Sequence, residues 1–196
     1  MTIKDSWGKV LYSDMHGDSE GLAAELPLEE ADLSGKWLAG AALAGANLKR
    51  ANLRSANLDG ADMDSAILED ANLESASCEG TQFSDANLQR VNAMGADFYQ
   101  AVFFRANLAY ANLENAELLG ADLKNANLEG VKLKNANLGE GNMGANTELH
   151  NANLRNAIVD GANFKNALYN NKTVFPGGFD PDEHSMILDS DNEVMG

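Results

Sequence analysis

A five-residue repeat runs through most of this chain and constrains its fold more than any other feature. From Ala31 to Asn171 the sequence divides into 28 pentapeptides of the form Ala-(Asn/Asp)-Leu-x-x, 23 over 31–145 and five over 147–171. The first slot is Ala in 22 of the 28 repeats and the third is Leu in 18. One extra residue near 144–146 separates the two runs, so the repeat is nearly continuous.

A period of five excludes both a long amphipathic helix and a flat strand. Five steps of about 100° would scatter the Leu side chains around a helix axis, and an odd period would alternate them between the faces of a sheet. The pattern instead predicts a chain that turns a corner every five residues, with slots one and three pointing inward. Four corners close a square coil of about 20 residues, and coils stack about 4.8 Å apart. The 28 repeats then predict about seven coils.

The other slots agree with this interpretation. Slot two is Asn or Asp in 17 of the 28 repeats and slot five is Gly or Asn in 16, which are residues that favour tight turns. Stacking places residues twenty apart on one face, so Phe83 and Phe103 are predicted to be neighbours, with the small Ala93 across the axis from Phe103. The third face is predicted to run through Leu43, Met63, Phe83, Phe103, Leu123, Met143 and Phe164.

Tandem Ala-(Asn/Asp)-Leu-x-x motifs of this kind, over 141 of 196 residues, resemble the pentapeptide repeat family. The resemblance implies an all-β fold, a right-handed quadrilateral β-helix or solenoid, and the handedness comes from the resemblance alone. Members of the family are abundant in cyanobacteria. The better understood members bind DNA gyrase and protect it from quinolones and other poisons, by resembling duplex DNA in shape and charge.

The flank at 1–30 is expected to cap the first coil, because a solenoid must cover its open ends. It contains several apolar residues, and a short helix is predicted over 19–26. Trp37 and Ala42 are apolar in outward slots and are expected to lie beneath this segment. Lys36 occupies an inward slot, which indicates a loosened first coil.

The flank at 172–196 is expected to cap the last coil in the same way. Ile158 and Leu168 are apolar where Asn is usual, so they are expected to be covered. The candidates to cover them are Val174, Phe175, Phe179, Met186 and Ile187. The last seven residues or so are expected to be disordered.

Composition narrows the function further. The net charge of −16 disfavours direct binding of nucleic acid, and no apolar run approaches the length of a membrane span. The first residues lack the apolar core of a secretory signal, which favours a cytoplasmic location. The single Cys78 lies in an inward slot, and His16, His150 and His184 are far apart in the sequence. We therefore expect no catalytic site, no metal and no cofactor.

Eight acidic residues fall between Arg54 and Arg90 with no basic residue among them. This acidic belt consists of Asp59, Asp62, Asp64, Glu69, Asp70, Glu74, Glu79 and Asp85. Its outward slots predict either a solvated face that keeps the rod soluble or a surface that steers a basic partner.

Four bulky side chains occupy outward slots of the fourth coil, where other coils are polar. This collar consists of Met94, Tyr99, Phe104 and Tyr110. It predicts an interaction surface, although the four residues lie on different faces and a flank offers an alternative cover.

The sequence favours a non-enzymatic scaffold that binds an unidentified protein and is itself a monomer or weak dimer. The alternative is a DNA-mimicking regulator or protector of a type II topoisomerase, DNA gyrase. Against this alternative, the repeat region carries a net charge of only −6, and neither a long loop insertion nor a long apolar dimer helix is evident. Fold resemblance alone does not decide between the two functions.

Overall fold

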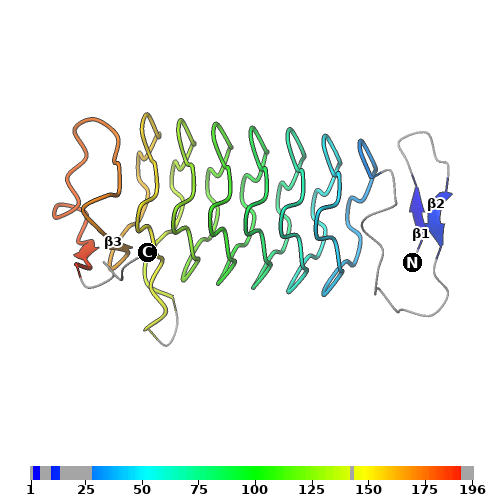
Figure 1. Ribbon diagram of the computed structural model, residues 1–196, viewed down its shortest axis with the longest axis horizontal. Coiled ribbons are helices and arrows are strands. Elements are labelled where there is room, and N and C mark those ends of the chain that lie inside the picture. Colours follow the sequence, from blue (N-terminus) through cyan, green and yellow to red (C-terminus); the bar gives the residue numbers. More distant parts are fainter. Residues whose placement is uncertain (1, 5–9, 14–27, 142–143, 191–196) are drawn as a thin grey trace.

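The computed structural model describes residues 2–4, 10–13, 28–141 and 144–190. Its main part is a tower of stacked coils with the N-terminal hairpin at one end and a C-terminal cap at the other (Figure 1). The strands are β1 (Thr2–Lys4), β2 (Val10–Ser13), β3 (Leu168–Tyr169) and β4 (Ile187–Leu188). β1 and β2 pair antiparallel, whereas β3 and β4 pair parallel. No helix in the described residues is long and apolar enough to cross a membrane.

Parallel backbone bridges between slot-two residues hold the coils together. They join residues twenty apart without interruption from Asp32↔Asn52 to Glu117↔Asn137. The predicted coil of four repeats is therefore confirmed over this region. We number its faces 1 to 4 after the repeats that begin at Ala31, Lys36, Ala41 and Ala46, and each later repeat shares the face of the repeat one coil before it.

Slots two and five build the corners, as their residue types predict. Slot five has a positive φ in every repeat from Gly35 to Asn135, including Arg50 at 57° and Tyr110 at 60°. The slot-two side chain closes the same turn from within: Asn47 Oδ1 accepts a hydrogen bond of 3.2 Å from the backbone N–H of Lys49. Asn and Asp suit slot two because their short side chains reach the backbone two residues ahead.

Slots one and three form a continuous buried core. Phe83 and Phe103 stack with ring centroids 5.0 Å apart, which confirms the predicted pair. Phe98 on face 2 meets both rings edge-on at 6.1 and 5.2 Å, and Ala93 on face 1 is fully buried. A small residue on one face thus leaves room for the large rings on the others.

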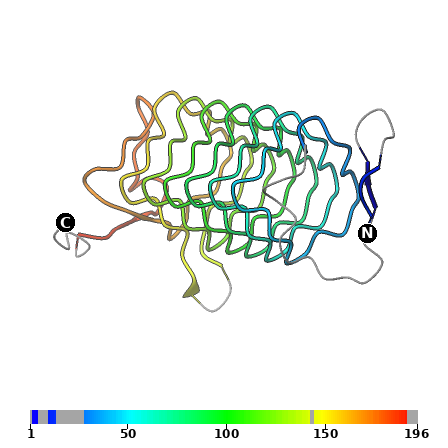
Figure 2. The same ribbon diagram turned by 45° about the vertical axis from the view of Figure 1, so that its right-hand side comes forward.

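The break in the repeat is six residues long, so the prediction of a one-residue insertion near 144–146 is wrong. Bridges resume with Asp122↔Glu148, a spacing of 26 instead of twenty. The two described parts of this loop, 139–141 and 144–146, leave the tower and protrude from one side in both views (Figures 1 and 2). Glu140 and Asn146 bridge antiparallel at its base, and Thr147 Oγ1 donates to Gly139 O at 3.0 Å.

The loop also changes the predicted order of core residues on the third face. Leu149, not Met143, follows Leu123, because Leu123 N donates to Glu148 O. Met143 lies outside the described residues. Phe164 stacks above Leu138 on face 2, since Leu138 N donates to Asn163 O, so its assignment to the face of Phe103 is wrong.

At the N-terminal end, the tower begins before the predicted boundary at residue 30. Leu28 is fully buried, and Glu30 N donates to Lys49 O as other slot-five residues do, so these residues belong to the first coil. The segment 19–26 lies outside the described residues, and so do the side chains of 1–27. Trp37 is 74% exposed, so the expectation that it is covered is wrong. Lys36 is exposed too, yet its backbone N–H keeps the regular turn bond to Leu33 O.

At the C-terminal end, aromatic rings cover the core as predicted. Phe179 meets Phe164 edge-on at 5.3 Å and stacks on Phe175 at 4.9 Å, and Met186 is buried. β4 pairs with β3 and extends face 3. Ile158, however, remains 44% exposed, so its predicted cover is absent from the described chain.

The other apolar residues of this end are likewise covered in part and exposed in part. Leu168 is half-buried where it pairs with Ile187, whereas Val174 and Ile187 themselves remain partly exposed. Residues 191–196, which include most of the segment expected to be disordered, lie outside the described residues.

The core stack predicts losses of stability of very different size for two adjacent phenylalanines. Phe103→Ala should lower the free energy of unfolding by about 3–5 kcal/mol, because it leaves a cavity beside Phe83 and Phe98. Phe104→Ala should cost less than about 1.5 kcal/mol, because Phe104 points outward and is only half-buried. Urea denaturation of both variants measures the difference. Similar losses would contradict the alternation of inward and outward slots.

Burial raises the pKa of the Cys78 thiol well above its usual range, and the charges of Asp59 and Asp97 add to the effect. We therefore expect no reaction of the native protein with a thiol-specific chromogenic reagent, and one thiol per chain after unfolding. Ser75→Cys places a thiol on an exposed corner and serves as the control, which should react at once. Rapid labelling of native Cys78 would show that the coil opens locally.

Candidate interaction surface

The acidic belt of the sequence does not form one surface in space. Coils stack every twenty residues, so the neighbours of an acidic side chain lie one coil above or below it. Basic residues that are distant in the sequence therefore reach into the belt from adjacent coils. The belt divides into acids that are paired in this way and acids that are not.

Face 4 carries the largest network of paired charges. Lys49 Nζ lies 2.9 Å from Glu69, and Arg90 pairs with both Glu69 and Asp70, the latter at 2.8 Å. The hydrogen bond from Lys49, followed by that from Arg90, lowers the pKa of Glu69 below its usual range. The hydrogen bond from Arg90 does the same for the pKa of Asp70.

Faces 1 and 3 each contain one ion pair that involves an acid of the belt. On face 1, Arg54 lies 3.1 Å from Glu74. On face 3, Arg105 Nε donates to Asp85 Oδ1 at 2.7 Å and lowers the pKa of that carboxyl. Half of the predicted belt is thus neutralised by cations one coil away.

Face 2 differs because its acids have no basic partner within the described residues. Its five middle repeats, over 56–60, 76–80, 96–100, 116–120 and 136–140, contain no Lys or Arg, whereas its first and last repeats contain Lys36 and Lys165. The five middle repeats contain five acids, of which Glu140 lies where the loop leaves the tower; the other four form two vertical pairs that face outward, namely Asp59, Glu79, Asp97 and Glu117. We call these four residues the face 2 acids.

The hydrogen bonds of the face 2 acids fix the carboxylates without removing their charge. Asp59 Oδ1 accepts from Ser77 Oγ at 2.6 Å and from Glu79 N at 3.0 Å. Asp97 accepts from Tyr99 N, and Glu117 accepts from Asn137 Nδ2 at 2.8 Å. Asp97 and Glu117 are bridge partners, so their like charges stack at about the 4.8 Å strand spacing.

The shape of face 2 also suits contact with another surface. Its corners are glycines at Gly40, Gly60 and Gly80, and a Cβ placed on any of them would meet no atom within 4 Å. Trp37, exposed in the first coil, stands in the same column as Asp97 and Glu117. The first three coils of face 2 therefore have small corners and an exposed aromatic ring at one end, whereas the loop residues Gly141 and Ala145 lie beside Tyr99 and Gly120 further along the face.

The structure separates the four collar residues. Tyr99 lies on face 2, half-buried, in the same column as Asp59 and Glu79. Met94 is 37% exposed on face 1, and Phe104 on face 3 lies under the guanidinium of Arg105 at 4.7 Å.

Tyr110 on face 4 covers Gly130, where its ring would lie 2.6 Å from an added Cβ. The collar therefore does not form one patch, and only Tyr99 joins the face 2 acids.

Sequence reasoning missed Trp37, Asp97 and Glu117 as members of this surface. The period contained the signal that could have found them. Residues 37, 57, 77, 97 and 117 follow one another at intervals of twenty, so they must stack in one column. Of the remaining belt residues, Asp64 on face 3 accepts a hydrogen bond of 2.8 Å from Ser84 N.

A second charged cluster lies beside the C-terminal cap. His150 is buried, with Nε2 3.1 Å from Asp189 and Nδ1 3.7 Å from Glu148, and Lys124 lies 2.7 Å from the same Glu148. These contacts fasten the segment after β4 to face 3. Within the described residues, no group of three or more His, Cys, Asp or Glu side chains is arranged to hold a metal ion.

Comparison with known proteins decides the family. The sequence profile of pentapeptide repeats matches residues 31–70, 66–103, 101–139 and 145–168. The chain belongs to the pentapeptide repeat family. The right-handed quadrilateral β-helix of this family agrees with the twenty-residue ladder.

Two solved pentapeptide repeat proteins from cyanobacteria are similar to this chain. HetL of Nostoc sp. strain PCC 7120, involved in regulation of heterocyst differentiation, is 35% identical over 68% of each chain, with a TM-score of 0.53. Rfr23 of Cyanothece 51142 is 28% identical over 65% of this chain and 90% of its own, with a TM-score of 0.54.

A third solved structure, the fluoroquinolone resistance protein QnrB1, is only 19% identical. It covers 81% of this chain and 82% of its own, and its TM-score of 0.36 supports no functional inference. No curated protein matches the sequence significantly.

The face 4 network predicts a pH-dependent contribution to stability. Arg90→Gln should lower the midpoint of thermal unfolding slightly at neutral pH, because Glu69 and Asp70 lose their partner. The pKa of each acid is lower in the folded protein than in the unfolded chain. The stabilisation is therefore fully present above the unfolded carboxyl pKa values of about 4, and it should be lost as the pH falls below them and through the lower folded values.

Arg155→Gln is the matched control, because Arg155 is exposed and has no ion pair with any described residue. Its effect should not change with pH. An Arg90→Gln deficit that stays constant down to the acid limit would contradict an electrostatic origin.

Proposed function

We propose that this protein is a non-enzymatic scaffold that presents face 2 to a basic surface of a partner protein. The observation that carries the proposal is the uneven neutralisation of charge: each of faces 1, 3 and 4 has acids that pair with cations one coil away, whereas none of the face 2 acids has such a pair among the described residues. Stacked like charges are unfavourable in the free protein, and a positive partner relieves that repulsion.

The rigidity of the tower supports this role. Backbone bridges fix the positions of the face 2 acids, so little conformational freedom is lost on binding. Trp37 and Tyr99 add apolar area to the same face, and aromatic residues often contribute most to binding energy. Met94, Phe104 and Tyr110 point in other directions and would contact a second partner or none.

The alternative function is a regulator of DNA gyrase that occupies the DNA-binding groove of the enzyme. Two features favour it: the acidic face 2, and the loop over 139–146 that projects from the tower. The same experiment distinguishes it, because gyrase would then be the captured partner.

The test is affinity capture from a lysate of the source organism with an immobilised variant that neutralises the face 2 acids. This variant carries Asp59→Asn, Glu79→Gln, Asp97→Asn and Glu117→Gln. A partner that wild type retains should be lost, and raised salt should release it from wild type.

The control neutralises four acids on the other faces, Asp62→Asn, Asp64→Asn, Glu114→Gln and Glu129→Gln, with the same change in net charge. It should retain the partner. Equal losses from both variants would show that only net charge matters and would overturn the assignment to face 2. Capture of purified gyrase by wild type, lost in the face 2 variant, would establish the alternative.

A further inference from the structure

The C-terminal cap leaves one face of the last coil without a covering strand. β4 continues face 3, Val174 continues face 4 by a bridge to Asn153, and Ser185 O accepts from Asn166 N on face 2. On face 1 the ladder stops at Ile158. The top of face 1 is therefore an open β edge.

Three backbone groups of this edge have no hydrogen-bond partner among the described residues. In the coil below, Val131 O accepts from Ile158 N, Leu133 N donates to Ile158 O, and Asn135 N donates to Asp160 O. The corresponding groups in the last coil are Ala157 O, Val159 N and Gly161 N. They have the spacing of the ladder below and point toward the position of a missing strand.

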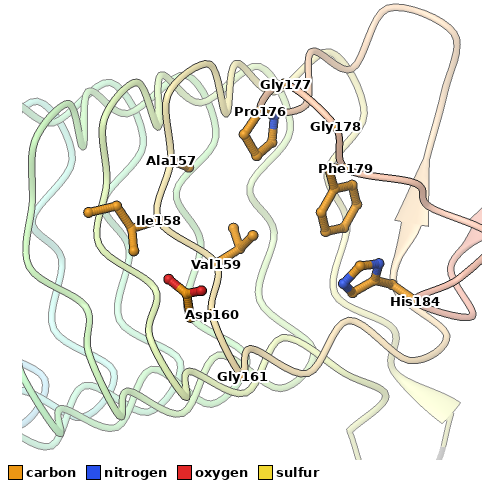
Figure 3. Close-up of a pocket in the computed structure, with 10 residues that line it drawn as sticks. All are labelled: Ala157, Ile158, Val159, Asp160, Gly161, Pro176, Gly177, Gly178, Phe179 and His184. Atoms are coloured by element: carbon orange, nitrogen blue, oxygen red, sulfur yellow. The ribbon is translucent and has the colours of Figure 1, made fainter.

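The position of the missing strand is a groove. It has a volume of about 470 Å³, with the edge from Ala157 to Gly161 on one side and the cap from Pro176 to Phe179 on the other (Figure 3). The cap does not close the ladder here: Pro176 has no N–H to donate, and no residue from Pro176 to Phe179 bonds to the backbone of this edge. His184 stacks on Phe179 at 4.1 Å and completes the far wall.

We propose that this groove binds an extended peptide segment of a partner protein by parallel β-strand addition. The peptide's second residue would donate its N–H to Ala157 O and accept from Val159 N at its C=O. Its fourth residue would accept from Gly161 N. An extended backbone is the ligand that satisfies all three groups, as in other cases of strand addition at a sheet edge.

The side chains around the groove define the chemistry of the peptide. The peptide's first residue lies above Ala157, which is nearly buried, so a small residue fits there. Asp160 lies in the groove, and Asp180 and Asp182 lie in the adjoining cap, with no ion pair to any described residue. A segment with Lys or Arg at its outward positions complements these charges.

The C-terminal tail of this chain does not have the chemistry of such a segment. Residues 191–196 contain Asp191 and Glu193 and no basic residue, and they follow β4, which lies on face 3. The groove is separate from face 2, so this proposal and the scaffold function fail or succeed independently.

The probe is a fluorescein-labelled peptide with two copies of Ala-Arg-Leu-Lys-Gly, titrated with the full chain by fluorescence anisotropy. We expect saturable binding. Binding should weaken about tenfold or more when Pro replaces both Arg residues, because the donor to Ala157 O is lost. It should also weaken strongly when Glu replaces Arg and Lys.

The matched protein variants are Val159→Pro and Val159→Ala. Proline removes an N–H that has no partner in the described chain, so folding loses no hydrogen bond there, while alanine keeps the N–H. Val159→Pro should lose at least tenfold in affinity and Val159→Ala much less. Asp160→Asn should weaken binding, whereas Asp97→Asn on face 2 should not.

Several results would overturn the proposal. One is the absence of binding, and another is equal binding of the proline-containing peptide. If Val159→Pro does not fold, the peptide comparison still decides. Binding that appears only after removal of residues 191–196 would show that the chain's own tail fills the groove. Concentration-dependent dimers that Val159→Pro abolishes would assign the edge to a second copy.

Discussion

The backbone ladder between residues one coil apart is the interaction on which the rest of this structure depends. It fixes the rise between coils, and each corner then needs a residue with a left-handed backbone conformation at every fifth position. Alanine in slot one and a larger apolar residue in slot three fill the square that remains. The outward side chains are left free to vary, and their arrangement determines what the surface can bind.

The sequence predicted the regular part of the tower well because each slot has its own physical requirement. It identified the inward slots, the corners and the stacked pair Phe83 and Phe103. It misjudged the length of the insertion for a simple reason. An insertion of six residues and an insertion of one residue shift the five-residue pattern by the same amount, so the repeat alone does not distinguish them. The bridges that are 26 residues apart, beginning with Asp122↔Glu148, show that six residues leave the tower.

The candidate site was harder to predict, because charge in a solenoid is organised by coils and not by neighbours in sequence. Glu69 and Asp85 seemed unpaired in a run without basic residues, yet Lys49, Arg90 and Arg105 reach them from adjacent coils. Counting in steps of twenty would have separated these acids from Asp59 and Glu79. The exposure of Trp37 and the open edge at Val159 depend on how the ends fold, which no repeat pattern specifies.

The short reach of the ladder has a consequence for synthesis of the protein. Among the described residues of the tower, no bridge joins positions more than 26 apart, so each coil needs only the preceding one as its template. A nascent chain can therefore add coils in order as it leaves the ribosome. Throughout translation the growing end exposes a β edge that can pair with other chains. The cap from Val174 to β4 is made last and covers most of that edge.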